Sequence, residues 1–430
     1  MTGAPVSGEP PPFRVALALW ARIGWISFGG PAGQIALMHR ELVERRRWIG
    51  EARFLHAVNF CMLLPGPEAQ QLATYVGWTL HGTRGGVAAG LLFILPSVAV
   101  LWALAAIYVT WGTVPFVLAI LAGVKPTVVA LVAHALVRLG RRALRQPLHV
   151  GFAGGAFVAL SLHVPFPAVV ATATALGLVA GRRARGFATP PQAGAESDVG
   201  AGCHGRAPSP RSTLILVALL AGLWIAPFAV IAGPLEGSLP VARSLYLFFT
   251  RAAFVTFGGA YAVLTYVAEV ATSRFGWVTP GEMIDGLALA ETTPGPLIMV
   301  LQFVGFVAGW RQPGTLSPLA AATLGALVTT WATFLPCFAF ILVGAPYIDA
   351  LRGRPALASA LAGVTAAAVG VILHLAVVFG REVLLPFGEI DVTAAGVALG
   401  ALALLLRSTE AHWVVLTGAL AGLAFGAFGT

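Results

Sequence analysis

Residues 22–30 read Arg-Ile-Gly-Trp-Ile-Ser-Phe-Gly-Gly, and residues 251–259 read Arg-Ala-Ala-Phe-Val-Thr-Phe-Gly-Gly. The same shift of 229 positions carries the Pro-Gly-Pro at 65–67 onto the Pro-Gly-Pro at 294–296. The chain is therefore built from two copies of one unit, and such a repeat determines the architecture before any local feature does. Both motifs contain helix-interrupting residues. In an apolar chain, interruptions at matching positions of two halves are typical of a transport site between the halves.

The composition places most of this chain in lipid. Of its 430 residues, 58% are hydrophobic and only 10% are charged, whereas a soluble domain carries about 25% charged residues. The apolar runs lack the two-residue alternation of strands, and lipid permits only helices or closed barrels. We therefore predict an all-α polytopic membrane protein with roughly 10–14 membrane helices, short half-helices included.

The net charge of +9 does not indicate a nucleic-acid partner. The arginines cluster at the ends of apolar segments, which in a membrane protein marks cytoplasmic loops. The three cysteines show neither a pairing pattern nor metal-ligand spacing. We expect membrane lipid as the surroundings, and neither a metal nor a cofactor.

The polar segments divide the chain into four parts. We expect a first copy at 13–181, a flexible polar linker at 182–212, an extra transmembrane helix at 213–233 and a second copy at 240–428. Within each copy, two short helices should flank the Pro-Gly-Pro, at 52–64 and 67–81 in the first copy and at 281–293 and 296–310 in the second.

Loop charges differ between the copies. The loop at 40–53 holds five arginines, whereas the equivalent stretch of the second copy holds only Arg274. Because positive loops stay in the cytoplasm, the two copies should lie in opposite orientations, and the unmatched segment at 213–233 provides the extra crossing. We predict inverted-topology repeats with discontinuous helices. The alternative is a parallel duplication whose loops have drifted.

Each interruption followed by a new helix leaves unpaired N–H groups and a partial positive charge, which suit an anion. The alternative is that these are kinks stabilised by neighbouring helices. The predicted substrate contacts at the interruptions are Gly29, Gly30, Pro31, Pro65, Gly66, Pro67, Gly258, Gly259, Thr293, Pro294, Gly295 and Pro296.

Several polar residues lie within apolar segments, where such residues usually have a function. Arg22 and Arg251 suit bidentate bonding to an oxyanion, although they could instead extend to the membrane interface. Lys125, the only lysine in the chain, could bind substrate or pair with a carboxylate.

Glu68 directly follows the first Pro-Gly-Pro, with Gln70 and Gln71 in the next turn, and Glu291 precedes the second. We predict Gln70 and Gln71 as substrate contacts. Glu68 and Glu291 are candidates for proton coupling, the alternative being carboxylates paired with Arg or Lys.

Several motifs together resemble the chromate ion transporter family in its long, fused, two-domain form. They are Phe-Gly-Gly-Pro at 28–31, Trp-Ile at 48–49, Leu-Pro-Gly-Pro-Glu-Ala-Gln-Gln-Leu-Ala-Thr-Tyr at 64–75, Gly-Thr-Arg-Gly-Gly at 82–86, Phe-Gly-Gly at 257–259 and Thr-Pro-Gly-Pro at 293–296. The resemblance implies export of chromate across the bacterial inner membrane, driven by an ion gradient or the membrane potential, and chromate resistance. It implies sulfate as a mimic and competitor. The second copy departs from the first at Ala260 and Leu297, where the first has Pro31 and Glu68.

We hypothesise that the four interruptions meet near the middle of the membrane, hold a tetrahedral dianionic oxyanion and alternate access by rocking of the copies. The rival interpretations are uptake or exchange of sulfate or another oxyanion and, from another class, a membrane-embedded enzyme. The sequence shows no evident nucleophile–base pair and no phosphate-binding loop. It leaves the oligomeric state open, a homodimer included.

Overall fold

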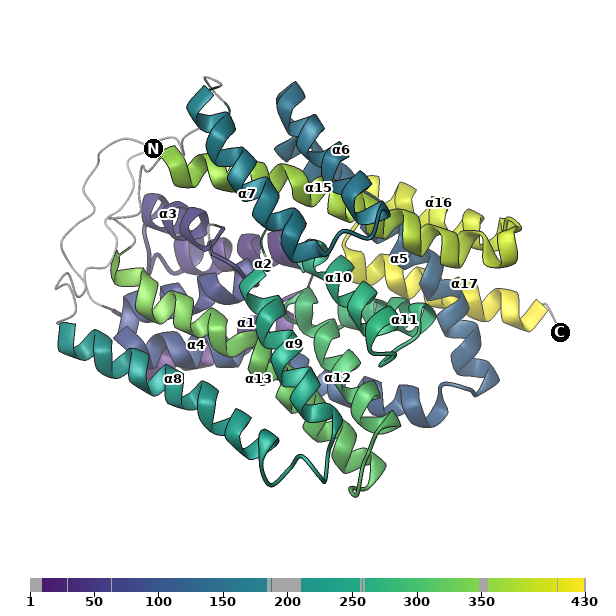
Figure 1. Ribbon diagram of the computed structural model, residues 1–430, viewed down its shortest axis with the longest axis horizontal. Coiled ribbons are helices and arrows are strands. Elements are labelled where there is room, and N and C mark those ends of the chain that lie inside the picture. Colours follow the sequence, from purple (N-terminus) through teal and green to yellow (C-terminus); the bar gives the residue numbers. More distant parts are fainter. Residues whose placement is uncertain are drawn as a thin grey trace.

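The structure is a computed structural model that describes residues 10–28, 30–62, 64–183, 187, 210–255, 257, 260–347, 355–407 and 409–428. These residues form helices and connecting turns, with no strand among them (Figure 1). The prediction of an all-α membrane protein is confirmed. The predicted contacts Gly29, Gly258 and Gly259 and most of the predicted linker 182–212 lie outside the described residues.

The first half contains seven helical elements among the described residues, besides a π-helical turn. They are α1 (Phe13–Ile26), α2 (Gly30–His39), α3 (Glu51–Cys61), α4 (Glu68–Trp111), α5 (Pro115–Ala143), α6 (Pro147–Ser161) and α7 (Phe166–Arg183). The short helix expected at 67–81 is the first part of α4, which is interrupted at His81 and Gly82 and so comprises two helices. The chain turns back at this break, where Gly82 adopts a φ of 63° and His81 is also non-helical, so that Gly77 and Gly85 lie in contact across the turn; glycine accepts positive φ at little cost.

The second half repeats this order after α8 (Pro210–Ala232), which has no partner in the first half. Its helices are α9 (Val241–Val255), α10 (Ala260–Glu269), α11 (Pro280–Thr292), a 3-10 turn (Leu297–Met299) leading into α12 (Val300–Arg311), α13 (Pro318–Gly344), α15 (Pro355–Leu384), α16 (Val392–Leu406) and α17 (Ala411–Phe428).

The repeat extends to backbone detail. Both α2 and α10 end in a π-helical turn, Arg40–Arg45 and Val270–Arg274. The next turn has a left-handed residue at Arg47 (φ 54°) and at Gly276 (φ 60°). The N–H of the following tryptophan then bonds a carbonyl six residues back at 2.8 Å in both halves, Trp48 to Leu42 and Trp277 to Ala271. Equivalent sequence therefore encodes equivalent local structure at the shift of 229.

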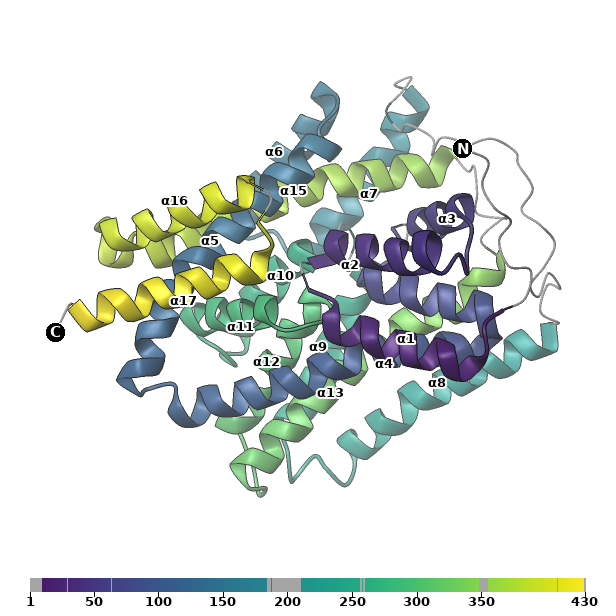
Figure 2. The ribbon, with the colours of Figure 1, turned by 180° about the vertical axis from the view of Figure 1, so that it is seen from behind.

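The two halves are intertwined. The long helix α5 of the first half packs against α16 and α17 of the second, and its counterpart α15 packs against α6 and α7 of the first (Figures 1 and 2). The last two helices of each half thus pack against the long helix of the other half. Close helix approach relies on small residues, as is usual in membranes: a Cβ on Gly123 would lie 2.0 Å from the Gly418 carbonyl oxygen.

Five of the described helices are long and apolar enough to cross a membrane: α4, α5, α13, α15 and residues Thr213–Ala232 of α8. In α8 only 6% of the most apolar window is buried, so almost its whole surface faces outward along one edge of the molecule (Figure 1). An apolar, outward-facing helix of this length is stable only in lipid.

Candidate functional site

The helix starts that follow the four interruptions meet at one small cavity. It is lined by Pro31 and Gln34 of α2, Pro67, Glu68 and Ala69 at the start of α4, Ala260 at the start of α10, and Pro296, Leu297 and Ile298 at the start of the turn that leads into α12. The two halves each contribute two starts, which lie together at the centre of the molecule (Figure 2). The structure therefore brings together Pro31, Pro67 and Pro296, which the sequence analysis singled out separately.

The residues that line the cavity lie in or next to the first turns of helical segments. Glu68 and Leu297 are the first residues of helical segments whose N-caps, Pro67 and Pro296, provide no side-chain cap. Within the described part of the chain, the N–H groups of Glu68, Ala69, Leu297 and Ile298 have no backbone acceptor, as expected for a first helical turn. Their partial positive charge favours an anion.

The two Pro-Gly-Pro loops pack reciprocally against the opposite half. Gly66 has a φ of 124°, and a Cβ there would lie 2.7 Å from Cys337 Sγ. Gly295 has a φ of 103°, and a Cβ there would lie 2.7 Å from Ser97 Cβ. Ser97 and Cys337 each follow the proline inside a long helix, α4 or α13. Only glycine combines this backbone with this proximity.

Gln34 is a cavity residue that the sequence analysis missed. It is fully buried, and its Nε2 donates to the carbonyl oxygens of Gly295 at 2.6 Å and Ser27 at 3.3 Å. The Gly295 N–H also donates to the Ser27 oxygen at 2.8 Å. The signal in the sequence was a glutamine one turn after the Gly-Gly-Pro in an otherwise apolar run. A glutamine at this position cannot be assigned a role without knowing which carbonyls lie opposite it in the fold.

Gln70, Gln71 and Thr293 lie beside the cavity and bond their own half. Gln71 Nε2 donates to the Pro65 oxygen at 2.7 Å, Gln70 Nε2 to Thr74 Oγ1 at 3.0 Å, and Thr293 Oγ1 to the Ala290 oxygen at 2.9 Å. All three predicted contacts are buried. In this conformation they support the Pro-Gly-Pro loops and do not line the cavity.

The two predicted arginines are elsewhere. Arg22 on α1 and Arg251 on α9 are exposed on the outside of the molecule. The structure does not bring them to the cavity.

Glu68 and Glu291 both lie beside the interruptions. Glu68 lines the cavity; Glu291 is buried and accepts a hydrogen bond of 2.5 Å from the Tyr261 hydroxyl. Neither has an ion-pair partner among the described residues. Tyr261 directly follows Ala260, so this bond links the two interruptions of the second half.

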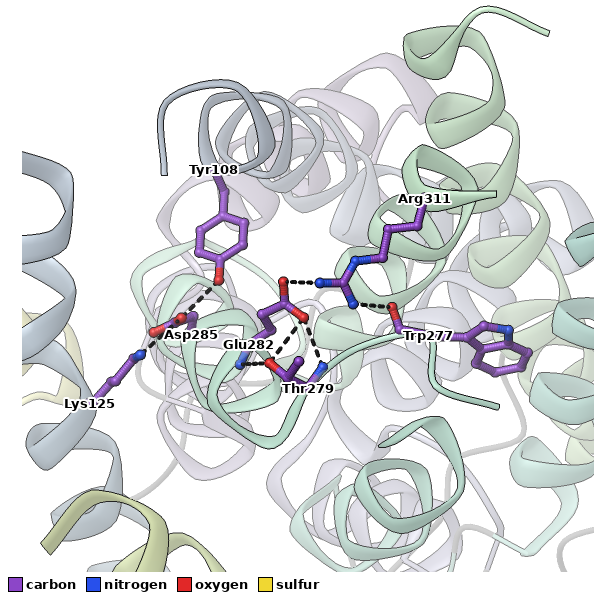
Figure 3. A network of polar contacts seen from close by, with 7 residues as sticks. All are labelled: Tyr108, Lys125, Trp277, Thr279, Glu282, Asp285 and Arg311. Carbon is purple, nitrogen blue, oxygen red and sulfur yellow. Dashed lines mark hydrogen bonds and ion pairs between the residues drawn. The ribbon is translucent and has the colours of Figure 1, made fainter. Parts of the chain in front are cut away.

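Lys125 pairs with a carboxylate, which was one of its two predicted alternatives. Its Nζ lies 3.4 Å from Asp285 Oδ2, and the Tyr108 hydroxyl donates to the same oxygen at 2.9 Å (Figure 3). Lys125 and Tyr108 belong to the first half and Asp285 to α11 of the second. At the start of α11, Arg311 bonds Glu282 at 2.7 Å and the Trp277 oxygen at 3.2 Å.

The cavity is too small for a tetrahedral oxyanion as it stands. About 10 Å³ of it is open to the centre of a water molecule, which is about the room that one ordered water requires. An oxyanion with four oxygens can enter only if the surrounding helix starts move apart. Among the described residues, no group of three His, Cys, Asp or Glu side chains could hold a metal ion.

Comparison with known proteins gives one consistent result. The family model for chromate transporters matches residues 15–178 and 243–423, which are the two halves. The chain is 32% identical to a chromate transport protein of Pseudomonas aeruginosa, over 96% of this chain and 95% of the relative. It is 27% identical to a chromate transport protein of Cupriavidus metallidurans, over 95% and 92%.

A third relative, a probable chromate transport protein of Synechococcus elongatus, is 28% identical over 84% of this chain and 83% of its own length. No solved structure matches the chain. These relatives are transport proteins, which excludes the membrane-embedded enzyme. With a family model that covers both halves and relatives aligned over nearly their full lengths, the chain belongs to the chromate transporter family.

Proposed function

We propose that this chromate transporter exports chromate across the bacterial inner membrane, and that the oxyanion binds where the four helix starts meet. The observation that carries the proposal is that one cavity is lined by residues of both halves whose first-turn N–H groups have no backbone acceptor among the described residues. Such groups, in a low-dielectric interior, favour a compact anion and show no preference among its rotations.

The direction of transport follows from charge. Moving a negative charge out of an inside-negative cell releases about 2.3 kcal/mol per charge per 100 mV, so export of an oxyanion needs no ATP. We propose that the cavity opens alternately to either side as the halves rock, because the present cavity admits about one water. Glu68, beside the bound anion, and Glu291, held by Tyr261, are the proposed carriers of any coupled proton.

The test uses purified protein in liposomes, with chromate flux measured against an imposed potential at fixed pH and against a pH gradient at zero potential. We expect chromate to move toward the positive side, and sulfate to compete. Flux of sulfate with no flux of chromate would instead favour the uptake or exchange of another oxyanion. Absence of any oxyanion flux would contradict the proposal.

The same assay tests the two carboxylates. If Glu68 or Glu291 carries a proton, Glu68→Gln or Glu291→Gln should abolish the response to a pH gradient and retain the response to voltage. Glu389→Gln, at an exposed residue outside the cavity, is the matched control and should respond like the wild type. An unchanged pH response in both cavity variants would exclude proton coupling through these groups.

A further inference from the structure

Gln34 connects one interruption from each half. Its side-chain amide donates to the carbonyl of Ser27, at the end of α1, and to the carbonyl of Gly295, in the second Pro-Gly-Pro. Both acceptors are carbonyl oxygens, which cannot donate. The orientation of the amide is therefore fixed by its partners, with the NH2 group toward the two carbonyls.

In each Pro-Gly-Pro loop a backbone carbonyl accepts a hydrogen bond from a glutamine side chain, but the two glutamines lie at different positions of the repeat. In the first half, Gln71 of α4 donates to the Pro65 carbonyl at 2.7 Å. The equivalent of Gln71 in the second half is Val300, which has no polar side-chain atom. The second loop instead receives the amide of Gln34 from the first half. The second loop thus takes its side-chain amide donor from the opposite half, whereas the first loop takes its donor from its own half.

The carbonyl of Gly295 determines where the adjacent N–H groups point. It belongs to the peptide plane shared with Pro296, and the proline ring fixes the next backbone angle. Holding this carbonyl therefore orients the peptide groups of Leu297 and Ile298, two residues that line the cavity. Without Gln34 the buried carbonyl would lack its side-chain donor, which is unfavourable, and rotation of the loop would relieve this.

We propose that Gln34 is a positioning residue that sets the oxyanion affinity of the site by holding the helix start of the second half toward the cavity. This inference rests on the proposed function, since it takes the cavity as the oxyanion site. Gln34 acts through Gly295 and Pro296, and contact between its own amide and the anion is not required.

The test compares two buried glutamines whose amides both bond a carbonyl of the opposite half. Gln34→Met removes the amide beside the cavity at nearly constant volume. Gln302→Met is the matched control, because Gln302 is buried and its Nε2 donates to the Val98 carbonyl at 2.9 Å, but it does not line the cavity. We expect Gln34→Met to raise the KM for chromate about tenfold, equivalent to about 1.4 kcal/mol of binding, with Vmax nearly unchanged. Gln302→Met should leave KM within about twofold of the wild type.

Equal KM values for the two methionine variants would overturn the inference, because both variants lose a buried amide bond between the halves. Gln34→Asn provides a second test if Gln34→Met folds poorly. It keeps the amide and the polarity but is one methylene too short to reach both carbonyls, so the same rise in KM is expected. A normal KM in Gln34→Asn would also count against the inference.

A second readout separates this inference from the proposed function. In a Leu297→Cys background without other cysteines, loss of the Gln34 amide should increase the reaction rate of the thiol with a small thiol reagent severalfold, and Gln302→Met should not. If the wild type carries no oxyanion, the proposed function fails while the thiol assay still reports whether Gln34 positions the helix start. Unchanged reactivity would overturn the positioning role by itself.

Discussion

Gly66 and Gly295 are two residues at which the structure tolerates little change. Both have a φ in the left-handed region, and both pack against a side chain of the other half. An L-residue there pays about 1–3 kcal/mol for the backbone alone, and its Cβ must also displace Cys337 or Ser97.

We therefore expect Gly66→Ala and Gly295→Ala each to reduce stability by about 2–3 kcal/mol and to impair chromate flux. Thermal unfolding in detergent and liposome flux measure the two effects. Gly154→Ala is the control: Gly154 lies in α6 and an added Cβ there meets nothing within 4 Å. If Gly66→Ala unfolds at the same temperature as Gly154→Ala, the strain assigned to the loop is absent.

At this scale the sequence predicted the residues whose role is a backbone property and missed those whose role is a contact. Proline and glycine mark an interruption wherever they occur, so Pro31, Pro67 and Pro296 could be placed at helix starts without knowledge of the fold. Gln34 could not be found, because its importance lies in a carbonyl 261 residues away along the chain. The predicted roles of Arg22 and Arg251 came from their position in apolar segments, which does not indicate the direction a side chain takes.

At the scale of elements, α5 and α11 pack together. Their contact includes an ion pair between the two halves, from Lys125 to Asp285. Asp285 is buried, with Lys125 and Tyr108 on the same carboxylate oxygen. The lysine side chain is about one third exposed. The burial of this ion pair is therefore intermediate between that of a surface pair and that of a fully buried pair.

We expect Lys125→Met to cost about 2 kcal/mol of stability, between the small value of an exposed pair and the large cost of leaving a buried charge unpaired. Adding Asp285→Asn should recover most of this loss, because the amide carries no charge and can still accept from Tyr108. Arg243→Met, which removes an exposed pair with Glu236, should change stability by less than about 0.5 kcal/mol. No recovery in the double variant would show that Lys125 does not neutralise Asp285.

Several helix starts were predictable because proline stands in the first turn. α5, α11 and α13 all have proline in their first turn, where its missing N–H costs nothing. The division of 67–110 into two helices agrees with the structure, because α4 is interrupted by non-helical residues at His81 and Gly82.

At the scale of the whole molecule, the intertwining of the halves lay beyond the sequence. A repeat shows that two similar units exist. It does not show that α6 and α7 pack against α15 of the other half, or that α16 and α17 pack against α5. Such packing depends on close approaches such as that of Gly123 and Gly418, and glycine is too frequent in this chain for those pairs to be recognised beforehand.

The predicted inversion of the halves can be tested at two equivalent exposed positions. Glu44 and Ser273 lie in the matching π-helical turns at the shift of 229. In a variant without native cysteines, Glu44→Cys and Ser273→Cys should react with an impermeant thiol reagent from opposite sides of the membrane. Reaction from the cytoplasmic side is expected for position 44, because its loop carries the arginines. Reaction of both from the same side would establish a parallel duplication.

The tightness of the central cavity has a consequence for the electrical behaviour of a cell that makes this protein. A space with room for about one water gives no continuous route for hydrated ions, so each passage has to wait for a helix rearrangement. Rearrangements of that size take microseconds to milliseconds, and a turnover limited to the slow end of this range carries on the order of a thousand ions per second. Patch recordings should therefore show no unitary steps, and the host could make many copies without discharging its membrane.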